Sequence, residues 1–293
     1  MNIGSQSMVA PLRTVLVKDP RASHVDQATV DAQWQTLHYP DRPDLARVQA
    51  EYAAFFATLA DFDVEIGTLP PAPETTLDSI YTHDPVAAVS RRGAVLGNMG
   101  KAARRAEPDA METYLRATGV PILGRIQAPG QVEGGDVCWL DARTVAVGEG
   151  YRTNAEGIRQ LRALLDDDVD EVIPVPLPHW TGPDDCLHLL SFISPVDHDK
   201  AVVYSRMMPV PFRQLLLDRG VQLIEVPDEE YDSFACNVLA VAPGVCIMLE
   251  GNPITQARLE AAGVAVHTFP GQDLCIKGGG GPTCLTRPLW RQV

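Results

Sequence analysis

Four residues with reactive or charged side chains could together carry out covalent catalysis: Asp84, Glu133, His188 and Cys284. A cysteine thiol can act as a nucleophile, and a histidine can transfer protons. One carboxylate can orient that histidine, and a second can bind a cation through charge-assisted hydrogen bonds. The set therefore favours attack by Cys284 on a positively charged substrate, if the fold brings the four residues together.

Each of these residues also has a simpler explanation when it is considered alone. Cys284 could be a small buried apolar residue, and His188 a core histidine with satisfied hydrogen bonds. Asp84 could cap a turn before Pro85, and Glu133 could be a surface charge before a glycine bend. The catalytic interpretation is favoured because the four residues recur at similar places in a repeated unit.

A run of four glycines, Gly278 to Gly281, leads through Pro282 and Thr283 into Cys284. Glycine has no Cβ, so such a run lets the backbone approach a ligand or another strand closely. We expect this stretch to deliver the Cys284 thiol to a cleft.

The chain repeats a unit of strand, turn, strand, helix and strand about every 50 residues. The leading strands of four units are predicted at residues 79–89, 132–140, 186–194 and 234–241. Aligning these strands places Asp84, Asp136, Ser191 and Asn237 at equivalent positions. We therefore predict that Asp136 and Ser191 bind substrate together with Asp84.

The first unit lacks a leading strand, and the chain ends in a spare strand at residues 284–290. Pairing the two would remove the exposed edges of the first and last units. We predict an α/β fold in which residues 1–293 form a single five-bladed propeller domain, closed by the C-terminal strand. An ordinary open α/β sheet would explain the alternation of elements but not the two orphan strands. Residues 20–44 are predicted to be a long mobile loop.

Composition narrows the class of partner. The formal charge of -14 argues against nucleic acid and anionic membranes and suits a cationic small molecule. The six cysteines form no CxxC pair, so no zinc site or disulfide framework is predicted. Replacing one of four cysteines should affect stability more than the catalytic rate. These are Cys138, Cys186, Cys236 and Cys246. No membrane span or leader is evident, which predicts a cytoplasmic protein. The sequence does not fix the oligomeric state, and a homo-oligomer is one possibility.

The repeat, the motif Glu133-Gly134-Gly135-Asp136, the His188 segment and the glycine-rich approach to Cys284 resemble the guanidino-group-modifying enzymes of the pentein superfamily. Within it, Gly148, the stretch 152–154 and Gly157 resemble the dimethylarginine dimethylaminohydrolases. The loop 278–283 is more similar to that of arginine deiminases.

The resemblance implies roles for further residues. Arg152 would hold a substrate carboxylate. Either Arg104 or Arg105 would do the same, and Arg105 is expected to be the one. Leu190 stands where arginine deiminases have an aspartate that binds the guanidinium group. Its apolar side chain would favour an N-alkylated guanidine.

The activity implied by this resemblance is hydrolysis of an N-omega-methylated arginine to citrulline and an amine. Cys284 would form a covalent S-alkylthiouronium, His188 would transfer protons, and Glu133 would hold His188, with no cofactor or metal. The alternatives are an arginine deiminase or an amidinotransferase acting on unmethylated arginine. A more remote one is a non-catalytic propeller that binds the ribosome.

Overall fold

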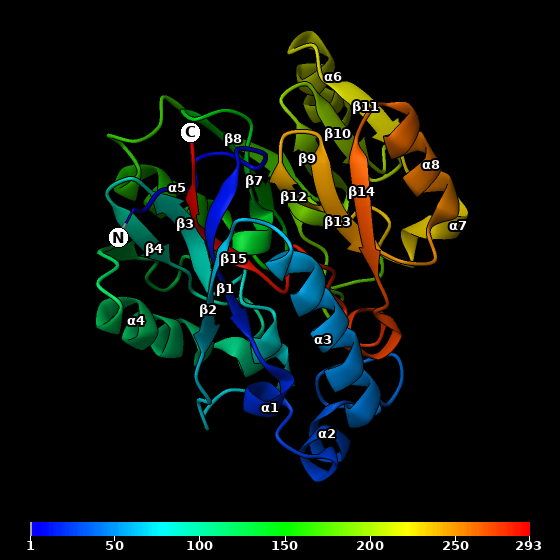
Figure 1. Cartoon of the computed structure of the whole chain (residues 1–293). Helices are drawn as coiled ribbons and strands as arrows, with labels where there is room; N and C mark the ends of the chain where they lie inside the picture. Colours follow the sequence, from blue (N-terminus) through cyan, green and yellow to red (C-terminus); the bar gives the residue numbers. More distant parts are fainter. Residues whose placement is uncertain (1) are drawn as a thin grey trace.

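The structure is a computed structural model that describes residues 2–293. It contains five sheets of three strands each, with helices around them (Figure 1). The strands are β1 (Leu12–Lys18), β2 (Glu65–Leu69), β3 (Val86–Ser90), β4 (Gly93–Leu96), β5 (Ile122–Arg125), β6 (Val137–Trp139), β7 (Thr144–Glu149), β8 (Glu171–Pro176), β9 (Ile193–Asp197), β10 (Lys200–Val203), β11 (Gln222–Glu225), β12 (Leu239–Ala242), β13 (Val245–Leu249), β14 (Ala265–Phe269) and β15 (Arg287–Arg291). The α-helices are α1 (Pro20–Ser23), α2 (Gln27–Gln33), α3 (Leu45–Ala60), α4 (Glu107–Ala117), α5 (Ala155–Leu164), α6 (Val210–Asp218), α7 (Asp228–Tyr231) and α8 (Pro253–Ala261).

Every sheet follows the same plan, which is the repeated unit expected from the sequence. The middle strand pairs antiparallel with one neighbour and parallel with the other, as β4 does with β3 and β5. The parallel partner is reached through a crossover helix, which is the connection that parallel strands require. The sheets are β3-β4-β5, β6-β7-β8, β9-β10-β11, β12-β13-β14 and β15-β1-β2.

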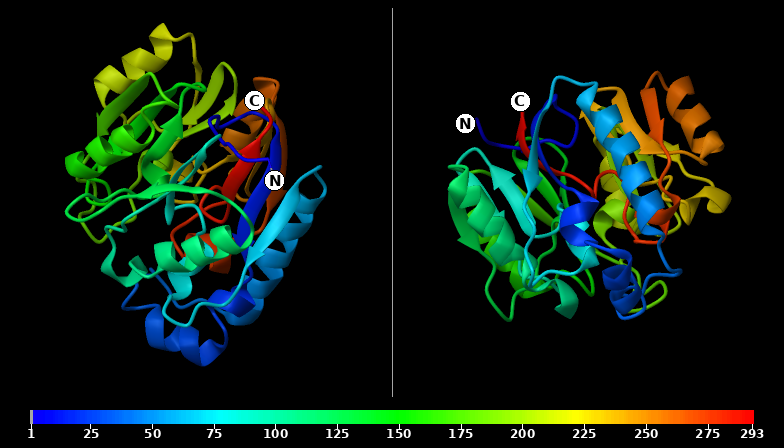
Figure 2. Two further views of the ribbon diagram at one scale, coloured as in Figure 1. Left: turned by 90° about the vertical axis from the view of Figure 1, so that its left-hand side faces the viewer. Right: turned by 60° about the horizontal axis from the view of Figure 1, so that its bottom comes forward.

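The C-terminal strand completes the first sheet, which confirms the predicted closure. β15 pairs antiparallel with β1, with Trp290 beside Thr14, and β1 pairs parallel with β2. Figure 2 shows, in views turned relative to Figure 1, that the red C-terminal strand lies beside the blue N-terminal strand. The buried Arg287 of β15 donates to the carbonyl oxygen of Val86 at 2.8 Å, and Arg291 donates to that of Ala240 at 2.8 Å. These bonds tie the closing strand to two other sheets.

The inner ends of the five sheets contact one another in a complete circuit. β15 contacts β3, β3 contacts the 3-10 turn Gly134–Asp136, and that turn contacts the 3-10 turn Leu189–Ser191. Onward, β9 contacts β12 and β12 contacts β1. The inner strands are almost wholly buried, as in β3 and β4, and their continuous apolar sequences reflect burial on both faces. Segments far apart in sequence therefore meet at the centre.

The segment 20–44 differs from the prediction, because it contains α1 and α2 rather than a loop without secondary structure. Asp26 caps α2 by accepting a hydrogen bond from the Thr29 backbone N–H at 2.8 Å. Leu37 and Tyr39 are buried in a small cluster with Val30. The mobility of this segment stays a prediction. Among residues 2–293, no helix combines the length and the apolar character that a membrane span requires.

Candidate active site

The predicted site residues lie just before the inner strands rather than within them. Glu133 immediately precedes the 3-10 turn Gly134–Asp136, and His188 caps the turn Leu189–Ser191 by donating its backbone N–H to the Ser191 hydroxyl at 3.0 Å. Cys284 lies three residues before β15, so the predicted strand at 284–290 begins later than expected. These turns project side chains from the ends of the sheets toward one another.

Asp84, Glu133 and His188 form the buried base of the site. Single ligand atoms of the three lie within 4.8 Å of one another. Nε2 of His188 is 2.7 Å from Oε2 of Glu133, while the other carboxylate oxygen accepts from the backbone N–H groups of Gly100 and Lys101 at 2.9 and 3.2 Å. Glu133 is thereby fixed on both sides, and it fixes the orientation of the imidazole ring.

Gly135 shows why the Glu133–Asp136 motif needs its second glycine. A Cβ at this position would lie 2.6 Å from Nδ1 of His188 and 2.9 Å from a carboxylate oxygen of Asp84. The Gly135 backbone N–H donates to that Asp84 oxygen at 2.9 Å. Any larger residue would push the histidine and the aspartate apart.

Cys284 is positioned by the glycine run and by Asn237. A Cβ on Gly278 would lie 1.7 Å from the Tyr81 hydroxyl oxygen, so the loop can pass this ring only as bare backbone. The Asn237 side-chain amide donates to the Cys284 sulfur at 3.2 Å, and its carbonyl oxygen accepts from the Thr283 backbone N–H at 3.0 Å. Asn237 therefore orients both the loop and the thiol.

Cys284 and His188 line a common cavity of about 150 Å³. Its walls include three aromatic side chains, Trp180, Tyr231 and Phe234. Further polar or ionisable groups facing it belong to Asp185, Cys186, Ser191, Asp232 and Asn237. Larger cavities lie elsewhere, one of about 300 Å³ around Lys18 and one of about 430 Å³ around Trp139. The chemistry-bearing cavity is thus small, polar at its base and aromatic on its walls.

The charges of the site divide into a cationic histidine and a neutral nucleophile. Burial alone would lower the pKa of His188, but the negative charges of Cys186, Asp84 and Asp136 raise it well above its ordinary value. Burial together with the charges of Asp84 and Cys186 raises the pKa of Cys284 to about 12. Without a bound cation, Cys284 is therefore a thiol at neutral pH.

The two carboxylates of the base remain ionised. Burial alone would raise the pKa of Asp84, but the positive charges of His188 and Arg104 hold it well below its usual range. Burial opposes ionisation of Glu133 as well, and the hydrogen bond from His188 lowers its pKa. Because Asp84, Glu133 and His188 cluster so closely, they could hold a metal ion geometrically. Arg104 and Arg152 already pair with the two carboxylates, and the absence of a metal requirement stays a prediction.

Asp136 lies beneath His188 rather than on the cavity wall. Its side chain is fully buried and accepts a hydrogen bond from the Leu189 backbone N–H at 2.9 Å. Burial raises the pKa of Asp136 to about 6, from an ordinary value of 3.8. The carboxyl therefore keeps its proton in the folded protein at pH values where the unfolded chain has lost it.

This burial predicts a pH-dependent effect of Asp136→Asn on stability. A raised folded pKa stabilises the native state below pH 4, and this contribution is lost as the pH rises through 6. The amide does not titrate, so the variant should gain roughly 3 kcal/mol relative to wild type between pH 4 and pH 7. Urea midpoints measured across this range provide the check. A stability difference that does not change with pH would contradict the assignment.

The structure brings Arg104, rather than Arg105, to the base of the site. Arg104 is buried, with one guanidinium nitrogen 2.5 Å from Asp84 and another 2.8 Å from Glu107. Arg105 is exposed. Arg152 is buried too, at 3.4 Å from Glu133 and donating to the Asp185 carbonyl oxygen at 3.1 Å. The predicted carboxylate-binding role of Arg105 does not fit its exposed position.

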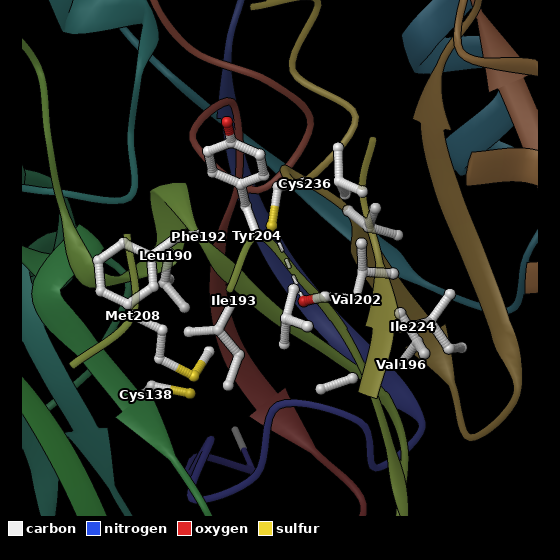
Figure 3. Close-up of a cluster of buried hydrophobic side chains, with 14 of the residues drawn as sticks. Cys138, Leu190, Phe192, Ile193, Val196, Val202, Tyr204, Met208, Ile224 and Cys236 are labelled. Carbon is white, nitrogen blue, oxygen red and sulfur yellow. Dashed lines mark hydrogen bonds between the residues drawn. The ribbon is translucent and has the colours of Figure 1, made fainter. Parts of the chain in front are cut away.

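Leu190 lies in the core and not on the cavity. Its side chain packs among buried apolar residues that include Phe192 and Met208 (Figure 3). The idea that Leu190 selects an alkylated guanidinium therefore does not fit its position. Leu187 and Ser191 of the same segment line the cavity instead.

Several residues at the site carry only weak signals in the sequence. Asn237 aligns with Asp84 in the repeat, and this alignment is the one sequence signal that points to it. Cys186 is predicted from the sequence to affect stability more than rate, although it lies only two residues from His188. Nothing in the sequence indicated that the three aromatic wall residues would gather around Cys284.

Solved structures define the class of protein. DDAH from Pseudomonas aeruginosa, solved as a cysteine-to-serine mutant complexed with citrulline, matches with a TM-score of 0.74 and 25% identity, covering 94% of this chain and 99% of that one. SxtG, an amidinotransferase from Microseira wollei, matches in fold with a TM-score of 0.80 at 14% identity, covering 99% of this chain and 98% of that one. The fold is the five-fold α/β propeller of the pentein superfamily, as the sequence predicted.

The particular family follows from the sequence comparison. The model of the family described as "N,N dimethylarginine dimethylhydrolase, eukaryotic" matches residues 24–291, and the chain belongs to this family. The dimethylarginine dimethylaminohydrolase of Pseudomonas aeruginosa is 29% identical over 272 residues, which are 93% of this chain and 97% of that enzyme. The arginine deiminase of Mycobacterium marinum is 34% identical over 192 residues, 55% of this chain and 46% of that enzyme.

Proposed function

We propose that this protein hydrolyses N-omega-methylated arginine to citrulline and methylamine or dimethylamine, with Cys284 as the nucleophile. The observation that carries the proposal is the shared cavity of Cys284 and His188, with Glu133 bonded to the imidazole beneath it. A dimethylarginine dimethylaminohydrolase matches over 93% of this chain, and a solved structure of such an enzyme contains citrulline.

Ionisation of Cys284 is coupled to substrate binding in this mechanism. The thiol is neutral in the free protein because burial and nearby negative charge raise its pKa to about 12. A guanidinium cation in the cavity counters that negative charge, so Cys284 releases its proton to solvent and the thiolate forms next to the carbon that it attacks. Attack gives a tetrahedral adduct, and loss of the alkylamine leaves the S-alkylthiouronium.

His188 serves both halves of the reaction. As an imidazolium held by Glu133, it protonates the departing amine, and it thereby becomes a neutral base. In that form it removes a proton from the water that hydrolyses the thiouronium. Nδ1 faces the cavity side, since Nε2 is bonded to Glu133.

The remaining residues would bind the substrate. Asp84 is proposed to bind the guanidinium group, which requires it to share its carboxylate with Arg104 or exchange partners. Arg152 and Arg104 are proposed to bind an α-carboxylate, which requires Arg152 to loosen its contact with Glu133 or Arg104 its contact with Asp84. Trp180, Tyr231 and Phe234 offer aromatic faces to an alkylated cation, and Asp185 and Asp232 add negative charge.

Arginine deiminase is the second candidate, favoured by the 34% identity to the Mycobacterium marinum enzyme over about half of this chain. An amidinotransferase would use the same covalent intermediate with an amine acceptor. A non-catalytic ribosome-binding propeller gives no reason for a thiol and a buried Glu133–His188 pair at one cavity.

A substrate panel in labelled water separates these functions. Dimethylarginine, monomethylarginine, arginine, agmatine and creatine would each be supplied in water enriched in oxygen-18, and ureido products measured by mass spectrometry. We expect labelled citrulline, formed fastest from the methylated arginines. Faster turnover of arginine would indicate a deiminase, and transfer to an added amine without label would indicate an amidinotransferase. No product from any substrate would refute the proposed function.

The aromatic wall predicts a preference that can be tested separately. Trp180 is 48% exposed, so replacing it should leave the fold intact. A cation–π contact at such a site contributes roughly 0.5–1 kcal/mol, so Trp180→Ala should raise KM for dimethylarginine about two- to five-fold. Steady-state kinetics with Trp180→Phe as the matched control, which retains a ring, provide the measurement. Equal KM values for wild type and both variants would remove Trp180 from the binding site.

A further inference from the structure

The active-site cavity contains a second thiol, that of Cys186. Cys186 is exposed and lines the same cavity as Cys284 and His188. By contrast, four other cysteines are buried at 0–1% exposure. These are Cys138, Cys236, Cys246 and Cys275. Cys186 therefore differs from the structural cysteines in both its access to solvent and its neighbours.

The imidazole of His188 faces Cys186 and not Cys284 in the unliganded protein. Its Nε2 atom is bonded to Glu133, so only Nδ1 is free to meet a thiol. Nδ1 lies 3.8 Å from the Cys186 sulfur. The Cys284 sulfur instead accepts a hydrogen bond from the Asn237 amide at 3.2 Å. The buried histidine thus has a thiol as its partner on the cavity side, and that thiol is not the catalytic one.

Nearby positive charge acts on the two thiols differently. Although the residue is exposed, the protein atoms packed around its sulfur would by themselves raise the pKa of Cys186, but the positive charges of His188 and Arg152 lower it below its ordinary value. Arg152 is anchored at this place through its hydrogen bond to the carbonyl oxygen of Asp185, the residue before Cys186. For Cys284, burial and the negative charges of Asp84 and Cys186 outweigh the charge of His188 and the hydrogen bond from Asn237, which also lower the pKa, and the pKa remains at about 12. A thiol next to an imidazolium and a guanidinium is the environment in which cysteines become reactive.

We propose that Cys186 is the reactive thiol of the unliganded protein and a site of reversible S-thiolation that closes the cavity. The Cys186 thiolate attacks one sulfur of a low-molecular-weight disulfide. The disulfide's S–S bond breaks, a new S–S bond forms to Cys186, and the other half leaves as a thiolate that takes a proton from water. No further oxidant is consumed, and excess thiol reverses the exchange.

The consequence for activity follows from the size of the cavity, and this part rests on the proposed function. A group attached to Cys186 would occupy part of the 150 Å³ that the substrate must enter. It would also remove the thiolate charge that favours the imidazolium of His188. Substrate binding and proton donation would both be impaired while Cys284 itself remained unmodified.

The site of modification can be tested without measuring activity. The full-length protein would be treated at neutral pH with 2-hydroxyethyl disulfide, or separately with limiting iodoacetamide, and the labelled peptides identified by mass spectrometry. We expect the Cys186 peptide to be labelled about ten-fold faster than the Cys284 peptide. Cys284→Ser should retain the label on Cys186 at the wild-type rate. Preferential labelling of Cys284, or no labelling of Cys186, would overturn the proposal even if the protein proves to be an active hydrolase.

The effect on catalysis is tested by protection. In wild type, activity should fall in proportion to labelling of Cys186 and return after dithiothreitol. Under the same treatment, the fraction of initial activity that Cys186→Ala loses should be less than one-tenth of the fraction that wild type loses. Cys246→Ala, which removes a buried thiol, should be inactivated like wild type. Equal inactivation of Cys186→Ala and wild type would show that Cys186 does not close the cavity.

Discussion

Replacing Cys284 by serine is expected to abolish citrulline formation while leaving the fold intact. The serine hydroxyl is far harder to ionise than a thiol, and the site already opposes an anion at this position, where burial and the charges of Asp84 and Cys186 act together. The loss in kcat should reach about four orders of magnitude or more. The measurement is ureido-product formation from dimethylarginine at saturating substrate.

The structure indicates why this variant should still fold. Cys284 is half-buried, and a serine oxygen can accept the same hydrogen bond from the Asn237 amide. Matching urea midpoints for Cys284→Ser and wild type would provide the control. Activity within ten-fold of wild type would mean that another residue, with Cys186 the first to examine, supplies the nucleophile.

The architecture was predictable because strands that are buried on both faces have apolar sequences that can be recognised. Inner strands such as β3 and β4 are buried along their whole length and read as unbroken apolar runs. The orphan strand at the C-terminus could be assigned because the first sheet needed a partner for β1. Convergence of Glu133 and His188 then followed from the repeat.

The positions of individual site residues were harder to predict because the local backbone is a 3-10 turn and not a strand. The expectation for Leu190 rests on the resemblance, in which arginine deiminases have an aspartate two residues after the histidine, and residues two apart share a face only in a strand. In a 3-10 turn, residues three apart share a face. His188 and Ser191 accordingly line the cavity together, while Leu190 is buried in the core.

Tertiary contacts decide which of Arg104 and Arg105 lies at the base of the site. The two residues are adjacent and chemically identical, so composition does not distinguish them. Arg104 is selected by Glu107 three residues later and by Asp84 across the site. The spacing to Glu107 was a local signal in the sequence, but the contact with Asp84 depends on the fold.

Replacing His188 by glycine is expected to trap the covalent intermediate on Cys284. Attack needs only the thiolate, which the bound guanidinium favours, whereas hydrolysis needs a base to activate water. Turnover should fall at least about 100-fold, the usual contribution of a positioned acid–base group. Mass spectrometry of quenched protein should show the thiouronium on the peptide containing Cys284. S-methylthiocitrulline is a suitable substrate for this experiment because its leaving group needs little protonation.

Loss of the imidazole also leaves Glu133 without its partner, so stability must be separated from chemistry. His188→Asn retains a donor that can reach the carboxylate of Glu133, and it should recover stability relative to His188→Gly without recovering turnover. Recovery of turnover by the asparagine would assign His188 a positioning role only. An adduct on Cys186 instead of Cys284 would exchange the roles of the two thiols, and rapid hydrolysis in both variants would remove His188 from the second half of the reaction.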